Sequence, residues 1–402
     1  MGAGNEAVPR QAMLLAAGLG ERMRPLSSGR AKPSLPLMNR PLLLHALDHL
    51  ARAGVRKVVV NLHHAPETVE AILSSARLPA ALSVAISREP QILGTSGGIR
   101  AALQHFDAGE PILVMNADSL SDADLGALAA AHEAAREARR APATLAVRGR
   151  RPGESYSPVH LDSQGLVCGI GDAGEVGDVR EEGDVRRVRE AGEVEDVREA
   201  GHVREAGEVR RVGETREEGE ALDVRSPVTF IGLHVVAPEA VARIPASGPS
   251  DIVRDVYQPH LREGGRLGAH HHRGWWVEIG TPALYLKAHL DLIGERGFLA
   301  SLPRTAGGLV EDLDRVFAGP GCEGLERARV RSTVLGPACR LGDGCAIQGS
   351  ILGTCARVGR GAKVVSSIGW DGAEVPDGAT IRSSLVLAGA KPGSPAEVLA
   401  LR

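Results

Sequence analysis

The chain has 402 residues, a length that predicts two or three domains. Its 47 Lys and Arg residues nearly balance 50 Asp and Glu residues, and the formal net charge of −3 argues against nucleic acid or an anionic membrane as the main partner. Only 2% of the residues are aromatic, which argues against a surface that stacks on single-stranded bases. The five cysteines form no CxxC pair and the N-terminal region lacks a long apolar run, so we expect a cytoplasmic protein with reduced thiols.

Short apolar runs alternate with amphipathic patterns over residues 11–147 and again over 226–290. We expect strands at 12–16, 55–62, 82–87, 111–115, 144–147, 228–236 and 275–279. We expect helices at 41–53, 66–74, 97–105, 120–139, 252–263 and 282–293. This alternation predicts an α/β fold with a Rossmann-like, mostly parallel sheet and helices on both faces.

Residues 172–220 interrupt this pattern with repeated variants of R-E-A-G-E-V. The segment holds 9 Arg against 17 Asp and Glu, and it has no aromatic residue, Leu or Ile. It cannot bury enough apolar surface to offset the chain entropy lost on ordering, so we expect an expanded, solvated insertion. A structured solenoid or a binding arm is the alternative. Without the segment the chain carries +5, which suits a protein that handles anionic ligands.

A third pattern begins near residue 330. Apolar residues recur at intervals of 7, 6 and 4, a 17-residue repeat that is seen three times between 334 and 385. One inward aliphatic side chain per short strand, with glycine-rich corners between strands, is typical of a hexapeptide-repeat left-handed parallel β-helix. We therefore expect an α/β domain at 1–298, a linker at 299–329 and a β-helix at 330–402.

A glycine loop follows the first expected strand, in the segment 15–20 with the sequence LAAGLG. Bare backbone N–H groups in such a loop can approach phosphate oxygens closely, and Arg22, Arg24 and Lys32 supply positive charge nearby. Met23 stands where a dinucleotide fingerprint needs its third glycine, and no P-loop motif is present, so both of those sites are excluded. The loop favours a site for the triphosphate of a nucleotide. A tight turn with surface arginines is the alternative.

Two carboxylates lie at the expected carboxyl ends of strands. Asp118 follows an apolar strand and Glu278 ends another, at the sheet edge where open α/β folds bind ligands. Carboxylate oxygens are hard ligands that suit Mg²⁺. The alternatives are that Asp118 caps the following helix and that Glu278 is a solvated residue at a strand end.

A second glycine-rich turn, with Gly94, Gly97 and Gly98, precedes the helix expected at 97–105. Backbone groups in such a turn can contact a base or a phosphate. The alternative is a glycine-rich entry to the helix with no ligand.

In order, the segments LAAGLGERMRPLS…KP, LGTSGG, NAD and WVEIGTP closely resemble the sugar-1-phosphate nucleotidyltransferase family. The resemblance covers residues 11–147 and 226–290, and the C-terminal repeat resembles the β-helix that many members of that family carry. It implies transfer of a nucleoside monophosphate from an NTP to a sugar 1-phosphate, giving an NDP-sugar and pyrophosphate with Mg²⁺ as cofactor.

The resemblance also implies roles for individual residues. Nucleotide-binding positions would be Leu15, Ala16, Ala17, Gly18, Gly20, Gly94, Thr95 and Gly98. Catalytic positions would be Arg22, Lys32 and Asp118, with Asp118 and Glu278 as the metal ligands. Two departures stand out: Glu21 replaces a small hydroxyl residue, and Glu278 replaces an aspartate. The family's usual sugar-binding segment falls where this chain runs into its insertion, so no sugar contacts carry over.

The substrates remain open among these expectations. The LGT-x-G turn and the β-helix favour an enzyme like the mannose-1-phosphate guanylyltransferases, whereas Asn61-Leu-His-His and Asn116-Ala-Asp resemble the N-acetylmuramate-1-phosphate uridylyltransferases. GTP and UTP are therefore both candidates. A non-catalytic regulatory paralogue that binds NDP-sugar is a third possibility, favoured by Glu21 and Glu278. The β-helix has no histidine to act as a general base, so we expect no acyltransferase; its role would be homo-oligomer contacts.

Overall fold

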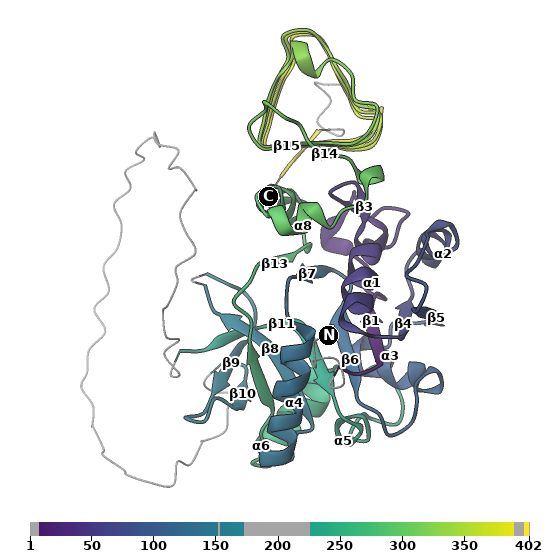
Figure 1. The fold of residues 1–402 in the computed structure, drawn as a ribbon, viewed down its shortest axis with the longest axis vertical. Helices are drawn as coiled ribbons and strands as arrows, with labels where there is room; N and C mark the ends of the chain where they lie inside the picture. The colour runs from purple at the N-terminus through teal and green to yellow at the C-terminus, as the bar shows by residue number, and fades with distance from the viewer. Residues whose placement is uncertain (1–7, 152, 173–225, 390–397, 402) are drawn as a thin grey trace, which may run out of the picture.

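A computed structural model describes residues 8–151, 153–172, 226–389 and 398–401 (Figure 1). Nearly all of the insertion expected at 172–220 lies outside the described residues. The described chain forms a mixed α/β part, followed by a C-terminal unit of short parallel strands, residues 308–389. None of its helices within the described ranges is long and apolar enough to cross a membrane.

The central sheet of the α/β part has the strand order β10-β9-β11-β6-β1-β4-β5, with β8 and β12 joined through β11. Its parallel strands are β1 (Gln11–Leu15), β4 (Lys57–Leu62), β5 (Ser83–Arg88) and β6 (Ile112–Asn116). Later strands join with antiparallel pairing on the far side of β6: β8 (Ala143–Gly149), β9 (Pro158–Leu161), β10 (Val167–Ile170) and β11 (Val228–Val236). A last strand, β12 (Gly268–His271), runs parallel to β8.

Both faces of the sheet are covered. Along β1, Ala12 and Leu14 pack into one hydrophobic core and Met13 packs into another, as expected for side chains that alternate across a strand. The helices of the described chain are α1 (Leu42–Ala53), α2 (Pro66–Ser75), α3 (Gly94–Ala102), α4 (Leu125–Arg139), α5 (Pro238–Val241), α6 (Gln258–Arg262), α7 (Pro282–Leu292) and α8 (Arg296–Ala300). The expected strands and most expected helices are confirmed to within a few residues.

The helix expected at 120–139 was wrong at its start. It begins at Leu125, because the Asp124 carboxylate accepts a hydrogen bond from the Ala127 amide and caps the helix. The residues before it form β7 (Ser119–Ser121), which pairs with β13 (Trp276–Glu278) in a small two-stranded sheet. Asp118 is therefore not the cap of this helix.

Two further helix boundaries differ. The helix expected at 97–105 begins earlier, at Gly94, and the one expected at 252–263 divides into a π-helical stretch, Val253–Tyr257, followed by α6. Pro259 in the first turn of α6 has no N–H to continue the preceding hydrogen-bond ladder, which accounts for the change of winding.

The C-terminal unit consists of three sheets in which strands pair in parallel at a spacing of 17 residues. The first sheet contains β15 (Val316–Ala318), β17 (Thr333–Leu335), β20 (Ile351–Leu352), β23 (Ile368–Gly369) and β26 (Ser384–Val386), flanked by β14 (Gly308–Leu309) and β27 (Val398–Ala400) in antiparallel pairing. The second contains β16 (Arg329–Arg331), β19 (Ala346–Gln348), β22 (Lys363–Val365) and β25 (Thr380–Arg382). The third contains β18 (Arg340–Leu341), β21 (Arg357–Val358) and β24 (Glu374–Val375).

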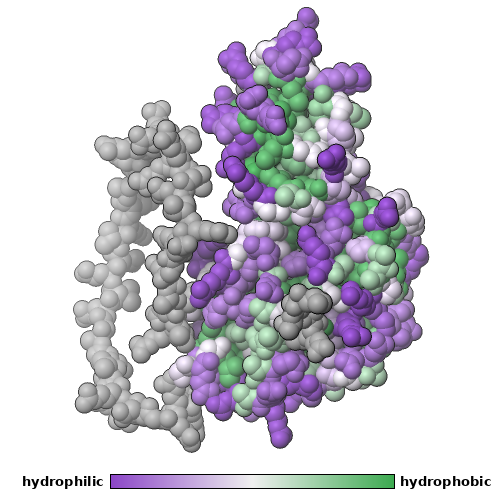
Figure 2. All heavy atoms as spheres, in the orientation of Figure 1, coloured by the Kyte–Doolittle hydropathy of each residue, from purple (hydrophilic) through white to green (hydrophobic). Residues whose placement is uncertain are grey.

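Seen nearly end-on in Figure 1, the three sheets outline a triangle. The apolar positions of the sequence repeat are all buried. Figure 2 shows hydrophobic residues gathered within that outline, with hydrophilic side chains projecting from its rim. The segment expected as a linker, 299–329, contains the last two residues of α8, all of β14 and β15, and the first residue of β16. Strand β15 already extends the first sheet.

The first sheet also packs against the α/β part. Phe317, Val334, Ile351 and Ile368 belong to the same hydrophobic core as Tyr285 of α7. The C-terminal unit and the α/β part are thus joined by buried apolar surface rather than by a bare connection.

Helix α1 begins after a short hairpin and ends at a glycine. A short hairpin, β2 (Pro36–Leu37) and β3 (Arg40–Pro41), leads into α1, whose apolar stripe is fully buried at Leu43 and Leu47. Helix α1 ends at Gly54, which adopts φ 104° and hydrogen-bonds back to the last turn.

Candidate active site

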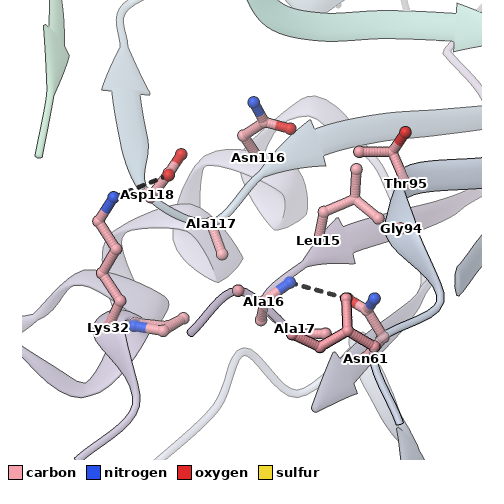
Figure 3. Close-up of a pocket in the computed structure, with 13 residues that line it drawn as sticks. Leu15, Ala16, Ala17, Lys32, Asn61, Gly94, Thr95, Asn116, Ala117 and Asp118 are labelled. Carbon is pink, nitrogen blue, oxygen red and sulfur yellow. Dashed lines mark hydrogen bonds and ion pairs between the residues drawn. The ribbon is translucent and has the colours of Figure 1, made fainter. Parts of the chain in front are cut away.

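A pocket of about 240 Å³ lies at the carboxyl ends of β1, β4 and β6 (Figure 3). The strand register explains the location, because Leu15 pairs with Asn61 on one side and with Asn116 on the other. The pocket is lined by Leu15, Ala16, Ala17, Gly18, Lys32, Pro33, Asn61, Ile92, Gly94, Thr95, Asn116, Ala117 and Asp118. Open α/β sheets bind ligands at this edge.

Eight of the residues expected at the site from the sequence line this pocket: Leu15, Ala16, Ala17, Gly18, Lys32, Gly94, Thr95 and Asp118. Four expected residues do not line it: Gly20, Arg22, Gly98 and Glu278. Residues that the sequence did not single out for the site also line it, namely Pro33, Asn61, Ile92, Asn116 and Ala117.

Lys32 and Asp118 form the charged end of the pocket. Lys32 is buried in the first turn of a short 3-10 helix, Lys32–Ser34, and its Nζ donates to Asp118 Oδ2 at 2.8 Å. The Asp118 side chain is 37% exposed, so the carboxylate reaches solvent while the lysine approaches it from the protein side. In Figure 3 this pair lies at one end of the pocket, and Gly94 and Thr95 lie at the other.

Asn61 fixes the floor of the pocket through both ends of its side-chain amide. Its Oδ1 accepts from the Ala16 amide at 2.8 Å, and its Nδ2 donates to Glu89 Oε1 at 2.7 Å. The other oxygen of Glu89 accepts from the Leu93 amide at 3.0 Å. This buried network ties the glycine loop after β1 to the turn before α3. One feature of the sequence could have identified Asn61 as a site residue: it is a polar residue near the carboxyl end of the apolar strand β4.

The turn at Gly94 has little freedom. Gly94 adopts φ 74°, and a Cβ there would lie 2.5 Å from the Ser250 carbonyl oxygen. The Thr95 hydroxyl donates to Asp251 Oδ2 at 3.0 Å and accepts from the Ile252 amide at 2.7 Å. The second glycine turn of the sequence is therefore held against the segment that leads into α6.

Gly20 and Gly98 meet structural needs behind the pocket wall. Gly20 adopts φ 63°, and its carbonyl accepts from the Ser27 hydroxyl at 2.7 Å, which folds the loop back on itself. A Cβ on Gly98 would lie 2.7 Å from Asn61 Nδ2 and 2.8 Å from Glu89 Oε1. Gly98 thus gives room to the Asn61 network.

Asn116 lies beside a bulge in the neighbouring strand. The register of β11 against β8 shifts between Phe230 and His234, and Gly232 within this stretch has φ 77°. A Cβ on Gly232 would lie 2.4 Å from Asn116 Nδ2, so the glycine makes space for that side chain at the pocket edge.

Glu278 lies next to Asp118 but outside the pocket wall. It pairs with Ser119 across β13 and β7, and the adjacent Ile279 amide donates to the Asp118 carbonyl at 2.9 Å. The Tyr156 hydroxyl donates to the Glu278 carboxylate. Burial raises the pKa of Glu278 and the Asp118 charge raises it further, whereas Lys32 opposes the rise. Two carboxylates that repel each other in this way fit a divalent cation, which prefers hard oxygen ligands.

Arg22 lies in the short 3-10 helix Glu21–Met23, with its side chain exposed to solvent. Its positive charge opposes the rise in the pKa of Glu278, so Arg22 lies within electrostatic range of that carboxylate. No group of three or more metal-ligating side chains gathers anywhere in the described ranges. The two carboxylates would therefore hold Mg²⁺ together with water and ligand oxygens, which is this ion's usual manner of binding.

A second pocket of about 250 Å³ has Glu278 in its wall. Its polar wall contains Arg148, which pairs with Glu154 at 2.5 Å and stacks over the Trp276 ring at 4.8 Å. Arg148 is buried and the Glu154 side chain is 12% exposed, and Arg148 Nε has no hydrogen-bond partner among the described residues. Its polar lining also contains Arg151, Ser155, Tyr156, Glu278, Lys287 and Asp291. Lys287 of α7 pairs with Asp291, so charges of both signs meet the Trp276 ring in this wall.

Comparisons with known proteins show the family of the chain. A family model described as nucleotidyl transferase matches residues 11–181. The N-acetylmuramate alpha-1-phosphate uridylyltransferase of Caulobacter vibrioides is 30% identical over 289 residues, which cover 71% of this chain and 97% of that relative. The mannose-1-phosphate guanylyltransferase catalytic subunit beta of Danio rerio is 24% identical over 322 residues, 78% of this chain and 70% of that relative. Its counterpart in Dictyostelium discoideum is 30% identical over 123 residues, 31% of this chain and 34% of that relative.

The chain belongs to the nucleotidyl transferase family, and it is a nucleotidyltransferase enzyme. The resemblance seen in its sequence motifs, to the sugar-1-phosphate nucleotidyltransferases, is thereby confirmed.

Proposed function

We propose that this enzyme transfers a nucleoside monophosphate from an NTP to a sugar 1-phosphate, releasing pyrophosphate and forming an NDP-sugar. The observation that carries the proposal is the pocket in which backbone from two glycine turns meets the Lys32–Asp118 pair. Such a pocket offers N–H groups and fixed positive charge to an anionic nucleotide, and a carboxylate to its metal ion.

The chemistry needs no covalent nucleophile, because the sugar phosphate already carries a charged oxygen that attacks the α-phosphorus in line. The walls from Leu15 to Gly18 and at Gly94 hold base and ribose, so the reacting groups are positioned. Lys32 stabilises negative charge on the transferring phosphoryl group, and Arg22 faces the leaving pyrophosphate. Asp118 and Glu278 would hold Mg²⁺, which when bound supplies positive charge to the phosphate oxygens.

The second pocket is the proposed site of the sugar 1-phosphate. Glu278 lines it, and Trp276 offers an aromatic wall. Arg148 and Lys287 pair with Glu154 and Asp291, whereas Arg151 has no ion pair among the described residues and is the proposed partner of the phosphate. A polar sugar with a phosphate is bound by this combination of charge and flat apolar surface.

GTP and UTP are the two candidate nucleotide donors. The LGT-x-G turn and the C-terminal repeat support a mannose-1-phosphate guanylyltransferase-like enzyme that uses GTP. The alignment with 97% of the Caulobacter uridylyltransferase supports UTP and N-acetylmuramate 1-phosphate. A non-catalytic paralogue that only binds NDP-sugar is the remaining alternative, and the intact Lys32–Asp118 pair speaks against it.

The C-terminal unit and the location of the enzyme are also part of what we propose. The 17-residue register and triangular outline support a left-handed parallel β-helix, with the α/β domain ending near residue 298. The exposed faces of this unit offer surface for a homo-oligomer. Nucleotide and sugar-phosphate substrates, and cysteines with no disulfide among the described residues, support a cytoplasmic enzyme.

A matrix of four NTPs against a panel of sugar 1-phosphates, with pyrophosphate release as the readout, tests the function. We expect release above background with Mg²⁺ for one nucleotide and a narrow set of sugars. The absence of release from every combination, at enzyme concentrations that bind nucleotide, would contradict the proposal and favour the regulatory paralogue.

A further inference from the structure

The segment that carries Lys32 is held by the C-terminal unit. Two residues before Lys32, the Arg30 guanidinium lies 5.7 Å from the ring centroid of Trp370. Its Nη1 lies 3.6 Å from Asp371 Oδ2, and this is its only ion pair among the described residues. Trp370 and Asp371 follow β23 at a corner of the C-terminal unit, far from Arg30 in sequence.

Both C-terminal partners are themselves fixed. The Trp370 amide donates to the Val386 carbonyl at 2.7 Å, in the next turn of the unit. Asp371 Oδ1 accepts from the Thr354 amide at 2.9 Å, in the preceding turn. The Arg30 side chain therefore meets a corner that neighbouring turns hold on both sides, rather than a mobile surface residue.

The chain after Lys32 is anchored from the same direction. Trp370 lies edge-on to Tyr285, with ring centroids 6.1 Å apart, and the Tyr285 hydroxyl donates to the Pro36 carbonyl at 2.5 Å. Asn39 Nδ2 donates to the Leu335 carbonyl at 2.8 Å, a backbone group of the C-terminal unit. Lys32 is thus bracketed by contacts that lead, directly or through α7, to this unit.

We expect these contacts to matter more for the position of Lys32 than for the stability of the fold. A cation–π contact and a partly exposed ion pair each contribute modestly to folding. Their effect on catalysis can be larger, because a catalytic group displaced by about 1 Å can lose about a hundredfold in rate. Lys32 meets Asp118 at 2.8 Å, so a shift of its backbone would act directly on the charged end of the pocket.

We propose that Trp370 and Asp371 are positioning residues for nucleotidyl transfer, acting through Arg30 to hold Lys32 in place. The inference rests on the proposed function for its catalytic consequence. It assigns the C-terminal unit a role in turnover.

Steady-state kinetics of Trp370→Ala and Asp371→Asn in the full chain test this role. We expect kcat to fall by about five- to tenfold with the KM for NTP within about twofold, because the lysine and not the base pocket is disturbed. Trp370→Phe keeps a ring for Arg30 and should restore most of the loss. Asp377→Asn is the matched control. Asp377 Oδ1 likewise accepts from an amide 17 residues earlier, that of Arg360 at 2.8 Å, but within the described part of the chain its side chain pairs only with Arg360, in the C-terminal unit.

Hydrogen–deuterium exchange provides a readout independent of turnover. Trp370→Ala should speed exchange of the amides between 30 and 36, with no change in peptides of β5, and Asp377→Asn should leave both unchanged. Unchanged kcat and unchanged exchange in Trp370→Ala and Asp371→Asn would overturn the inference, as would equal effects from Asp377→Asn. A wild-type enzyme without turnover would contradict the proposed function alone, while the exchange experiment would still decide whether the C-terminal unit holds Lys32.

Discussion

Lys32 and Asp118, 86 positions apart in the sequence, meet through a hydrogen bond of 2.8 Å between Nζ and Oδ2. The lysine is buried, and its positive charge lies where the glycine loop, β6 and the 3-10 helix Lys32–Ser34 converge. In the structure the two charges neutralise each other. Under the proposed function, a nucleotide and Mg²⁺ in the site would give Asp118 a cation to bind and would free Lys32 for a phosphate oxygen.

Lys32→Ala should abolish most activity without unfolding the protein. Loss of one group that stabilises transition-state charge typically costs about a hundred- to a thousandfold in kcat, and we expect a loss of that size in pyrophosphate release. Lys57→Ala is the matched control, because Lys57 also pairs with an aspartate, Asp107 at 2.7 Å, but at the opposite end of β4. Equal activity in the two variants would show that Lys32 is not catalytic.

Gly18→Ala separates ligand contact from folding. A Cβ on Gly18 would meet no atom within 4 Å, and its φ lies outside the left-handed region, so the folded chain accepts the methyl group. The methyl group would nevertheless point into the space where the backbone meets a ligand. We expect unchanged thermal stability and a KM for NTP raised by about tenfold or more, measured by initial rates.

Gly109→Ala is the comparison for Gly18→Ala, because we expect it to lower stability and leave the KM for NTP unchanged. Gly109 also has open space around its Cβ position, but it adopts φ 83° far from the pocket. That variant should lose about 1 kcal/mol of stability from backbone strain and keep its KM. An unchanged KM in Gly18→Ala would mean that the nucleotide does not approach the glycine loop.

The sequence predicted the strands, the glycine loop and the two carboxylates because each depends on local pattern. Asn61 and Asn116 were not assigned to the site, because their role depends on register: both pair with Leu15, and only the three-dimensional order of the strands brings them together. The sequence motif also suggested that Gly98 contacts the nucleotide, although Gly98 does not line the pocket. A glycine in a motif shows that space is needed, but only packing reveals that Asn61 and Glu89 fill it.

Glu278 should make both stability and metal binding depend on pH. Burial and the Asp118 charge raise its pKa above the ordinary value of 4.5. A raised folded-state pKa favours folding below the unfolded pKa, and that contribution is lost as pH rises through the folded pKa. Glu278→Gln should therefore gain stability relative to wild type between about pH 4 and about pH 8, measured by urea unfolding without Mg²⁺.

Mg²⁺ should favour the wild type over Glu278→Gln at high pH, because the cation needs an ionised carboxylate. At about pH 8, Mg²⁺ should raise the melting temperature of the wild type more than that of Glu278→Gln, and the Mg²⁺ concentration for half-maximal activity should rise in the variant. Glu278→Asp restores the carboxylate with a shorter reach and should recover part of the metal affinity. Identical Mg²⁺ responses in all three proteins would exclude Glu278 as a ligand.

Glu154 should show the opposite pH dependence, because its pKa is lowered. Burial alone would raise the pKa, but hydrogen bonds from Arg148 Nη2 at 2.5 Å and the Thr229 hydroxyl at 2.9 Å outweigh that effect. A depressed folded-state pKa contributes stability above the unfolded value near 4.5, and that stability is lost as pH falls through the folded pKa. Glu154→Gln leaves the Arg148 charge buried without its partner, so we expect a loss of about 3 kcal/mol at neutral pH.

Urea unfolding at about pH 7 and about pH 3 measures this difference, with Glu263→Gln as the control. Glu263 pairs with Arg243 at 2.8 Å, but its side chain is 59% exposed, so its loss should cost less than about 1 kcal/mol at either pH. The loss in Glu154→Gln should shrink at the lower pH, where the wild-type carboxyl approaches its own protonation. An equal loss at both pH values would mean that the buried pair contributes packing rather than charge.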